Sequence, residues 1–102
     1  MKIAILGAAE SGVGAAILAQ QKGYEVFVSD MGHIKDNYKT MLDAHYLAWE
    51  EGTHTEASIL DATEVIKSPG IPDTAPMVQK IIAAGIPIIS EIEFAARYTS
   101  AK

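Results

Sequence analysis

A glycine-rich segment near the start of the chain has the residue types of an anion-binding turn. Residues 7–14 read Gly-Ala-Ala-Glu-Ser-Gly-Val-Gly and directly follow a short apolar run. Gly7 permits a tight turn, and Gly12 permits close packing of a helix whose N-terminal N–H groups and dipole attract a phosphate. Against the dinucleotide-binding pattern GxGxxG, the middle position is Ala9, whose methyl group keeps a pyrophosphate further from the backbone. The alternative is a turn that merely needs small residues.

Asp30 is the second candidate, because it ends the second predicted strand. It lies 23 positions after Gly7. In dinucleotide-binding folds an acidic residue at about this spacing accepts hydrogen bonds from a ribose hydroxyl. An ordinary turn aspartate is the alternative interpretation. The two motifs together indicate a nucleotide, without saying which one.

A third segment, the turn Ser68-Pro69-Gly70, follows the fourth predicted strand. That strand is expected beside the first, across the point where the order of a parallel sheet reverses. The Ser68 side chain and the Gly70 N–H would then lie in the same crevice as Glu10 and Ser11. On its own, the turn carries little functional information.

The elements that must position these residues alternate along the chain. β-Branched and aromatic runs predict strands, and segments rich in Ala, Leu and Gln or with helical apolar spacing predict helices. The predicted strands are Lys2–Leu6, 24–29, 46–49, 63–67 and 86–89, and the predicted helices are 11–22, 34–44, 55–60, 75–84 and 92–98. This alternation predicts an α/β, Rossmann-like, open parallel five-stranded sheet flanked by helices on both faces.

Length and composition restrict the class of protein. The 102 residues suit one domain, and a hydrophobic content of 49% excludes a disordered chain. The chain has no cysteine, which excludes disulfides and thiolate sites. Its formal net charge of -5 argues against a nucleic-acid partner. No apolar run approaches the ~18 residues of a membrane span, so neither a membrane nor a targeting segment is expected and a cytoplasmic location is predicted.

Patterns typical of catalytic and metal-binding residues are absent from the sequence. His33, His45 and His54 match no metal-site spacing and are predicted to be solvated. Glu50 and Glu51 are interpreted as a solvated edge. The sequence contains no GxSxG, HExxH or GxxxxGK[ST] motif, and therefore no recognisable cradle for ATP phosphates. We predict no catalytic residue and no metal ligand in this chain.

Four segments together resemble the N-terminal domain of the Mur ligases, above all of the D-glutamate-adding members of that family. In chain order they read ILGAAESGVGAA, VSDMG, VIKSPGIP and IPIISEIEFAARY. The Ser-Pro-Gly-Ile-Pro turn, followed by the Ile-Ser-Glu-Ile-Glu-Phe segment, is the most specific part. The resemblance covers essentially all 102 residues. It also accounts for the missing ATP loop, because in that family a GTNGKST-type loop would begin just beyond Lys102.

The resemblance implies that residues 1–102 form a single UDP-sugar-binding domain, the N-terminal fragment of a longer multi-domain ligase. Such an enzyme of peptidoglycan synthesis uses ATP to phosphorylate the carboxylate of UDP-MurNAc-L-alanine, and the amine of D-glutamate then attacks the acyl phosphate to form an amide. The resemblance places the catalytic residues, ATP and Mg²⁺ in the remaining ligase domains, which would be partners in cis. It implies no cofactor in this fragment.

The residues carried over from the family fall on the three segments described first. Glu10 and Ser11 match positions that contact the uridine diphosphate, Asp30 matches the residue at the uracil–ribose end, and the turn after the fourth strand matches the loop over the uracil. The resulting UDP-binding residues are Gly7, Glu10, Ser11, Gly12, Asp30, Met31, Gly32, Ser68, Pro69 and Gly70. Met31-Gly32 stands where some members have Thr-Arg, so an arginine contact to the uracil is missing.

Two other functions remain open from the residues themselves. An NAD(H)-binding Rossmann domain of a dehydrogenase or sensor would use Gly7, Gly12 and Asp30, although Ala9 and the lack of a catalytic segment count against it. A ligand-free interaction module would use the same fold without any nucleotide.

Overall fold

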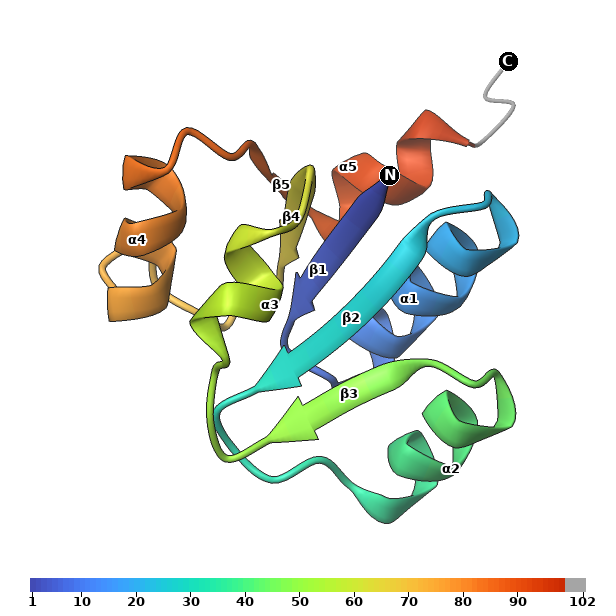
Figure 1. Cartoon of the computed structure of the whole chain (residues 1–102). Helices are drawn as coiled ribbons and strands as arrows, with labels where there is room; N and C mark the ends of the chain where they lie inside the picture. The colour runs from blue at the N-terminus through green and yellow to red at the C-terminus, as the bar shows by residue number, and fades with distance from the viewer. Residues whose placement is uncertain (99–102) are drawn as a thin grey trace.

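Strands and helices alternate through the described part of the chain, residues 1–98, in the computed structural model (Figure 1). The strands are β1 (Lys2–Leu6), β2 (Glu25–Asp30), β3 (Ala48–Glu51), β4 (Glu64–Lys67) and β5 (Ile88–Ser90). The helices are α1 (Glu10–Gln21), α2 (Asp36–Ala44), α3 (Glu56–Leu60), α4 (Pro76–Ala83) and α5 (Glu91–Arg97). Within residues 1–98, none of these helices has the length and apolarity that crossing a bilayer requires.

The five strands form one parallel sheet in the order β3-β2-β1-β4-β5. β1 lies in the centre, where Ile5 is opposite Val28 of β2 on one side and Ile66 of β4 on the other. A central parallel strand is covered on both faces, which explains why β1 is apolar throughout. The predicted open parallel sheet is confirmed, and so is the predicted pairing of the fourth strand with the first.

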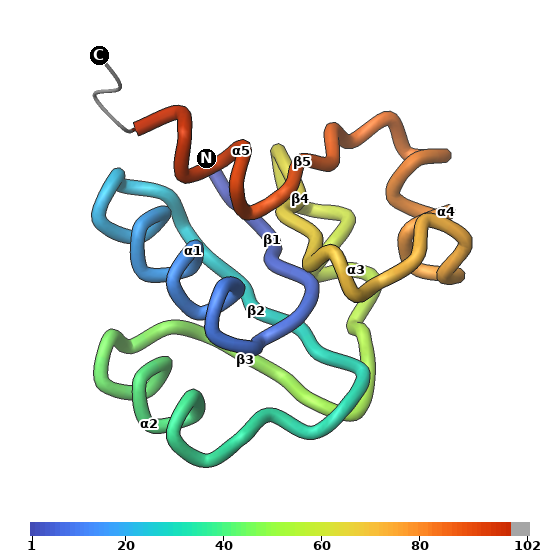
Figure 2. The backbone as a smooth tube through the Cα atoms, turned by 180° about the vertical axis from the view of Figure 1, so that it is seen from behind, coloured from blue at the N-terminus to red at the C-terminus, as the bar shows by residue number. Residues whose placement is uncertain are grey.

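Helices cover both faces of the sheet, as predicted. α1, α2 and α5 lie on one face and α3 and α4 on the other (Figures 1 and 2). Because successive side chains of a strand point to opposite faces, Ile3 and Ile5 face the first group, while Ala4 and Leu6 face the second. The chain changes face after β3, where the connection crosses to α3.

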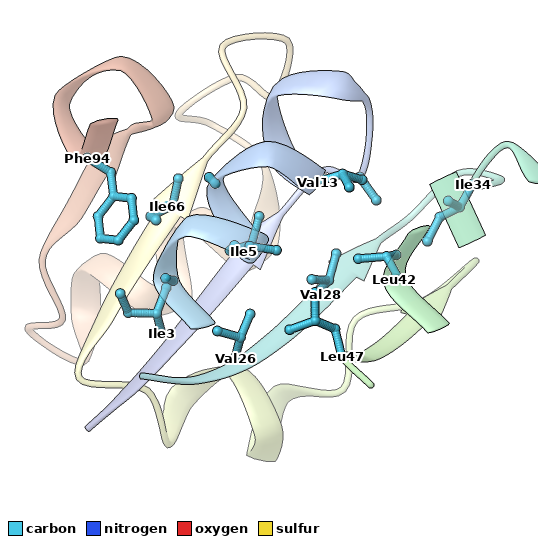
Figure 3. Close-up of a cluster of buried hydrophobic side chains, with 14 residues drawn as sticks. Ile3, Ile5, Val13, Val26, Val28, Ile34, Leu42, Leu47, Ile66 and Phe94 are labelled. Atoms are coloured by element: carbon cyan, nitrogen blue, oxygen red, sulfur yellow. The ribbon is translucent and has the colours of Figure 1, made fainter. Parts of the chain in front are cut away.

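The larger core lies between the sheet and α1, α2 and α5 (Figure 3). Val13, Leu42 and Phe94 come from these three helices and meet the strand residues Ile3, Ile5, Val26, Val28 and Ile66. The buried side of α1 consists mainly of small residues, namely Gly12, Ala15, Ala16 and Ala19. Small side chains let α1 lie close to the sheet, and this closeness positions its first turn.

A cluster of aromatic and charged residues joins α5 to the amino ends of the strands, and we call it the amino-end cluster. It consists of Tyr24, Glu64, Phe94, Arg97 and Tyr98. Arg97 donates two hydrogen bonds to the Glu64 carboxylate, at 3.0 and 2.9 Å. The hydroxyls of Tyr24 and Tyr98 are 3.0 Å apart, and the Phe94 ring meets both tyrosine rings edge-on. The last helix is thereby attached to the sheet at the end opposite to the strand termini that carry the predicted site.

Two strands begin two residues later than predicted, whereas the starts of the other three agree to within one residue. β3 was expected at 46–49, but Tyr46 has a positive φ of 56° and belongs to the turn that ends α2. β5 was expected at 86–89, but the Ile86 N–H donates to the Ile81 carbonyl at the end of α4. In both cases backbone hydrogen bonds of the preceding helix hold residues whose types favour a strand.

Candidate functional site

The carboxyl ends of β1 and β4 lie side by side at the point where the strand order of the sheet reverses. From β1 the chain leaves through α1 on one face, and from β4 it leaves through α4 on the other. Open α/β sheets bind their ligands at such a point, because the two diverging connections leave a crevice between them. The first and third predicted segments both lie at this edge.

The glycines of the first segment occupy positions where a side chain does not fit. Gly7 has a φ of +102°, and a Cβ added to it would lie 2.8 Å from the Ser68 Cβ. A Cβ added to Gly12 would lie 2.0 Å from the Gly7 carbonyl oxygen. The predicted close packing at Gly12 is confirmed. The turn after β1 also touches the turn after β4 at Ser68, so the first and third segments are in contact.

The N-terminus of α1 is open to an incoming anion. Its N-cap residue is Ala9, which has no side chain capable of capping the helix. The Val13 N–H donates to the Ala9 carbonyl at 2.9 Å. The helix N–H groups before Val13 have no acceptor among residues 1–98. Glu10 and Ser11 are exposed at the start of the helix. Unpaired N–H groups and the positive end of the helix dipole can therefore bind a phosphate here.

Asp30 connects two loops through its carboxylate. Oδ2 accepts the Ala8 N–H at 2.8 Å, and Oδ1 accepts the Gly32 N–H at 2.8 Å. The side chain thus holds the turn before α1 against the loop after β2. Asp30, predicted to bind a ribose, thus has a structural role at this edge. Each of its oxygens keeps a lone pair for a ligand hydroxyl.

A cavity of about 430 Å³ adjoins Asp30 between the ends of β2 and β3 and the start of α4. Its walls are both apolar and charged, and they are formed by Asp30, Met31, Thr53, His54, Glu56, Ile71, Ala75, Pro76, Met77 and Lys80. Met31 is 60% exposed, and Lys80 forms an ion pair with Glu56 at the cavity wall. The volume lies within the range of small-ligand sites.

The predicted site residues lie at one edge of the sheet but do not line one cavity. Asp30 and Met31 belong to the cavity just described. Ser11 lines a smaller cavity between α1 and α5, and Pro69 lines a third one beside β5. The Gly70 N–H, expected to face the crevice, lies 3.4 Å from its acceptor, the Ser68 hydroxyl.

Four residues beside the cavity were not recognised from the sequence. Ser29 is fully buried, and its Oγ lies 2.7 Å from Glu50 Oε2 and 2.6 Å from His54 Nδ1. The Glu50 carboxylate also accepts the N–H of Thr55 at 2.7 Å and its hydroxyl at 2.5 Å. The interpretation of Glu50 and His54 as solvated is wrong, because both are partly buried and hydrogen-bonded to Ser29. No local signal could have found this cluster, since Ser29 is more than 20 positions from its partners.

Burial and hydrogen bonding shift the pKa values of Glu50 and His54. Burial opposes ionisation of Glu50, but hydrogen bonds from Thr55 and Ser29 outweigh it and hold the pKa of the Glu50 carboxyl below its usual value. Burial lowers the pKa of the His54 imidazole and outweighs the carboxylates of Glu50 and Asp30, which act to raise it. Both shifts favour an ionised Glu50 next to a neutral His54 at neutral pH.

Glu91 is a second acidic group near the start of α1. It is 8% exposed at the first turn of α5, and burial raises the pKa of its carboxyl. It lines the smaller cavity together with Ser11. Among residues 1–98, no group of three or more histidine and carboxylate side chains is arranged to hold a metal ion.

Comparison with known protein families shows to which family the chain belongs. The family described as the MurD N-terminal domain matches residues 2–77. The chain belongs to the MurD N-terminal domain family. Among curated relatives of this MurD N-terminal domain, the UDP-N-acetylmuramoylalanine–D-glutamate ligase of Bacteroides thetaiotaomicron is 66% identical over 101 residues, covering 99% of this chain and 23% of the relative. That of Porphyromonas gingivalis is 62% identical over 99 residues, covering 97% and 22%.

Solved structures show the same fold at low sequence identity. A murein peptide ligase from Psychrobacter arcticus superposes with a TM-score of 0.85 and 22% identity, covering 97% of this chain and 21% of that one. The UDP-N-acetylmuramate–alanine ligase of Thermotoga maritima gives a TM-score of 0.80 with 19% identity, covering 95% and 22%. The MurD N-terminal domain therefore shares its architecture with N-terminal domains of other Mur ligases. The chain spans less than a quarter of the length of these relatives.

Proposed function

We propose that this chain binds the UDP moiety of UDP-MurNAc-L-alanine at the carboxyl end of its sheet. The diphosphate would bind at the N-terminus of α1 and the uracil in the 430 Å³ cavity. The observation that carries the proposal is a hydrogen bond that connects the two places. Ala8, which leads into α1, donates its N–H to Asp30, and Asp30 lines the cavity. A ribose beside Asp30 would therefore join phosphates at the helix to a base in the cavity.

Other proposed contacts surround this hydrogen bond. Glu10 and Ser11 lie at the diphosphate, and the Ser68-Pro69-Gly70 turn closes the site from the side of β4. Met31 is exposed and lines the cavity, so in place of the arginine of some relatives it would give the base an apolar contact. Gly32 is held by Asp30, which fixes the loop that carries Met31.

An NAD(H)-binding role is not favoured. The chain belongs to a family of ligase domains, and the curated relatives at 66% and 62% identity are named as ligases. The residues agree, because Ala9 stands where dinucleotide-binding turns have the glycine that admits a pyrophosphate.

For the whole protein we infer an ATP-dependent ligase that joins D-glutamate to UDP-MurNAc-L-alanine. The names of the relatives support this, and the chain corresponds to 23% and 22% of their lengths, which leaves room for further ligase domains in cis. ATP and Mg²⁺ do not fit the residues of this chain. It has no GxxxxGK[ST] loop, and its described residues hold no cluster of metal-ligating side chains. We assign their binding to those other domains.

Calorimetric titration of this chain with UDP-MurNAc-L-alanine, UDP and NADH tests the binding proposal. We expect weak binding of both uridine nucleotides, because the complete site draws on neighbouring domains, and weaker or no binding of NADH. Tighter binding of NADH than of UDP would contradict the proposal.

A matched pair of aspartate variants locates the site. Asp30→Asn leaves one acceptor oxygen for two loop N–H groups, so UDP affinity should fall about tenfold. Asp73→Asn removes an exposed carboxylate outside the cavity and should leave UDP affinity within about twofold. Equal UDP affinities for the wild-type chain and Asp30→Asn would contradict a site at Asp30, and a wild-type chain that binds no nucleotide would favour a ligand-free interaction module.

A further inference from the structure

The buried hydroxyl of Ser29 determines which nitrogen of His54 carries a proton. Ser29 Oγ has one hydrogen to donate, and it lies within hydrogen-bond distance of Glu50 Oε2, the Thr53 carbonyl and His54 Nδ1. A carboxylate oxygen 2.7 Å from a hydroxyl oxygen requires a hydrogen between them. Glu50 is ionised and has no hydrogen of its own, so Ser29 donates to Glu50. The remaining contact, at 2.6 Å, is then a donation from His54 Nδ1–H to Ser29 Oγ.

This hydrogen-bond chain leaves His54 Nε2 as an acceptor. A neutral imidazole carries one proton, and Nδ1 holds it here. Nε2 has no hydrogen-bond partner among residues 1–98, and every buried side-chain nitrogen or oxygen in that range does have one. Nε2 is therefore not enclosed by protein. His54 is one of the residues that line the 430 Å³ cavity, and we take its accessible Nε2 as the acceptor offered to a ligand there.

The bases of nucleotides differ in what they offer to such an acceptor. Uracil carries an N–H at N3, whereas cytosine, which has the same size and shape, carries a bare nitrogen at that position. A bare N3 opposite Nε2 would place two acceptors against each other and leave both unpaired, which is costly in a partly buried site. The Ala8 and Gly32 N–H groups fix the orientation of the Asp30 carboxylate, which the proposed function places beside the ribose and not the base.

We propose that His54, oriented by Ser29 and Glu50, selects uracil by accepting a hydrogen bond from its N3–H at Nε2. This inference rests on the proposed function, because it needs a nucleoside diphosphate with its base in this cavity. It adds a selectivity residue that no motif of the sequence indicated. Ser29 and Glu50 do not touch the base and act as positioning residues.

Titrations of the intact chain with UDP and with CDP test the inference. The wild-type chain should bind UDP about tenfold more tightly than CDP. His54→Leu should weaken UDP about tenfold and leave CDP nearly unchanged, so that the preference disappears. His54→Gln should bind both nucleotides within about threefold, because its amide can present either an oxygen or an NH₂ group. Ser29→Ala, which frees the ring, should reduce the preference without abolishing binding.

His45→Leu is the matched control, because His45 ends α2, outside the cavity, and its Nδ1 pairs with the Met41 carbonyl. It should keep the UDP preference. A UDP preference that survives in His54→Leu, or a wild-type chain that binds UDP and CDP equally, would overturn the inference while leaving the proposed function intact. A wild-type chain that binds no UDP would overturn both.

The tautomer can be measured without any variant. Nitrogen-15 NMR of the histidine rings distinguishes a protonated Nδ1 from a protonated Nε2. We expect His54 to be neutral at neutral pH with its proton on Nδ1. A proton on Nε2 would overturn the inference, since that nitrogen would then be a donor facing a donor.

Discussion

The two ends of the sheet use polar side chains in opposite ways. At the amino end, polar groups bind one another. Arg97 pairs with Glu64, Tyr24 meets Tyr98, and the Lys2 ammonium lies 3.6 Å from the Asp61 carboxylate. Each of these contacts joins two elements of the fold. The amino end therefore serves mainly to hold the elements of the fold together.

At the carboxyl end, polar groups hold other groups in place around the proposed ligand site. Asp30 fixes the loops on either side of it, and Ser29 with Glu50 fixes the His54 ring. The first three N–H groups of α1 and His54 Nε2 remain without protein partners within residues 1–98. We therefore expect substitutions at the amino end to change mainly stability, and substitutions at the carboxyl end to change mainly nucleotide affinity.

The largest expected effect on stability is at Phe94. Its ring is fully buried between α5 and the sheet, so Phe94→Ala should cost about 3–5 kcal/mol of unfolding free energy, measured by urea denaturation. UDP affinity at a temperature where the variant is folded should change less than about threefold. Ile92→Ala, on the same helix but 80% exposed, is the control and should cost under about 0.5 kcal/mol. If Phe94→Ala lost UDP affinity in proportion to its lost stability, the two ends of the sheet would not have separate roles.

Gly12→Ala should be the next largest effect, and it should affect both properties. The added Cβ would lie 2.0 Å from a backbone oxygen that cannot give way, so we expect a loss of about 3 kcal/mol together with weaker UDP binding. Gly14→Ala, two positions along the same helix, has nothing within 4 Å of the added Cβ and should gain about 1 kcal/mol. Thermal melting of the pair measures the contrast. Equal melting temperatures would contradict the close approach of α1 to the turn.

Lowering the pH should weaken the carboxyl end first. The pKa of His54 is lower in the folded chain than in the unfolded one, so the unfolded chain takes up more protons as the pH falls below about 6.5. The contribution of His54 to stability should therefore be fully present above that pH, and the Tm should fall by a few degrees towards about pH 5. UDP preference should be lost over the same range, because protonated Nε2 becomes a donor.

Other charged groups also face this region, and the His54→Leu variant separates their effects. Asp30 of β2, Glu50 of β3, Glu56 of α3 and Lys80 of α4 lie around the His54 ring or the cavity. The pKa of Glu50 is lowered, so its contribution to stability is present above about 4.5 and is lost only at more acidic pH. His54→Leu should abolish the dependence between about pH 8 and about pH 5. An unchanged dependence would assign it to another group.

The smallest expected effect is that of the ion pair between Arg97 and Glu64. The pair is bidentate but partly exposed, so a double-mutant cycle with Arg97→Met and Glu64→Gln should give a coupling of about 0.5–1 kcal/mol. UDP affinity should be unaffected. The Tyr24 hydroxyl, whose pKa is raised chiefly by its hydrogen bond to Tyr98, adds stability that is lost only as the pH rises above about 10. Between about pH 5 and about pH 9 the amino end should therefore be insensitive to pH.

The sequence predicted the order and type of the elements because each depends on local residue types. β1 is an apolar β-branched run that stops at a glycine, and α4 begins with Pro76 at its first position, where a missing N–H costs nothing. The first residue of α5 was missed. Its start at Glu91 is set by a reciprocal cap in which Ser90 and Glu93 exchange hydrogen bonds, a pattern that the sequence contains as Ser-Glu-Ile-Glu.

The candidate site was predictable where it consists of backbone. Gly7 and Gly12 are required by local geometry, and their spacing is visible in the sequence. The side-chain part was not predictable, because Ser29, Glu50 and His54 are brought together only by the pairing of β2 with β3. In the sequence, Ser29 is an unremarkable strand residue, and His54 is a histidine in a loop.

The open first turn of α1 has a consequence for resistance to inhibitors. Its N–H groups belong to the main chain, so exchanging the exposed side chains of Glu10 or Ser11 leaves them in place. Gly7 and Gly12, which shape the turn, admit no side chain without disrupting the fold. A compound that binds these N–H groups through an acidic group would therefore leave the protein few single substitutions by which to escape it.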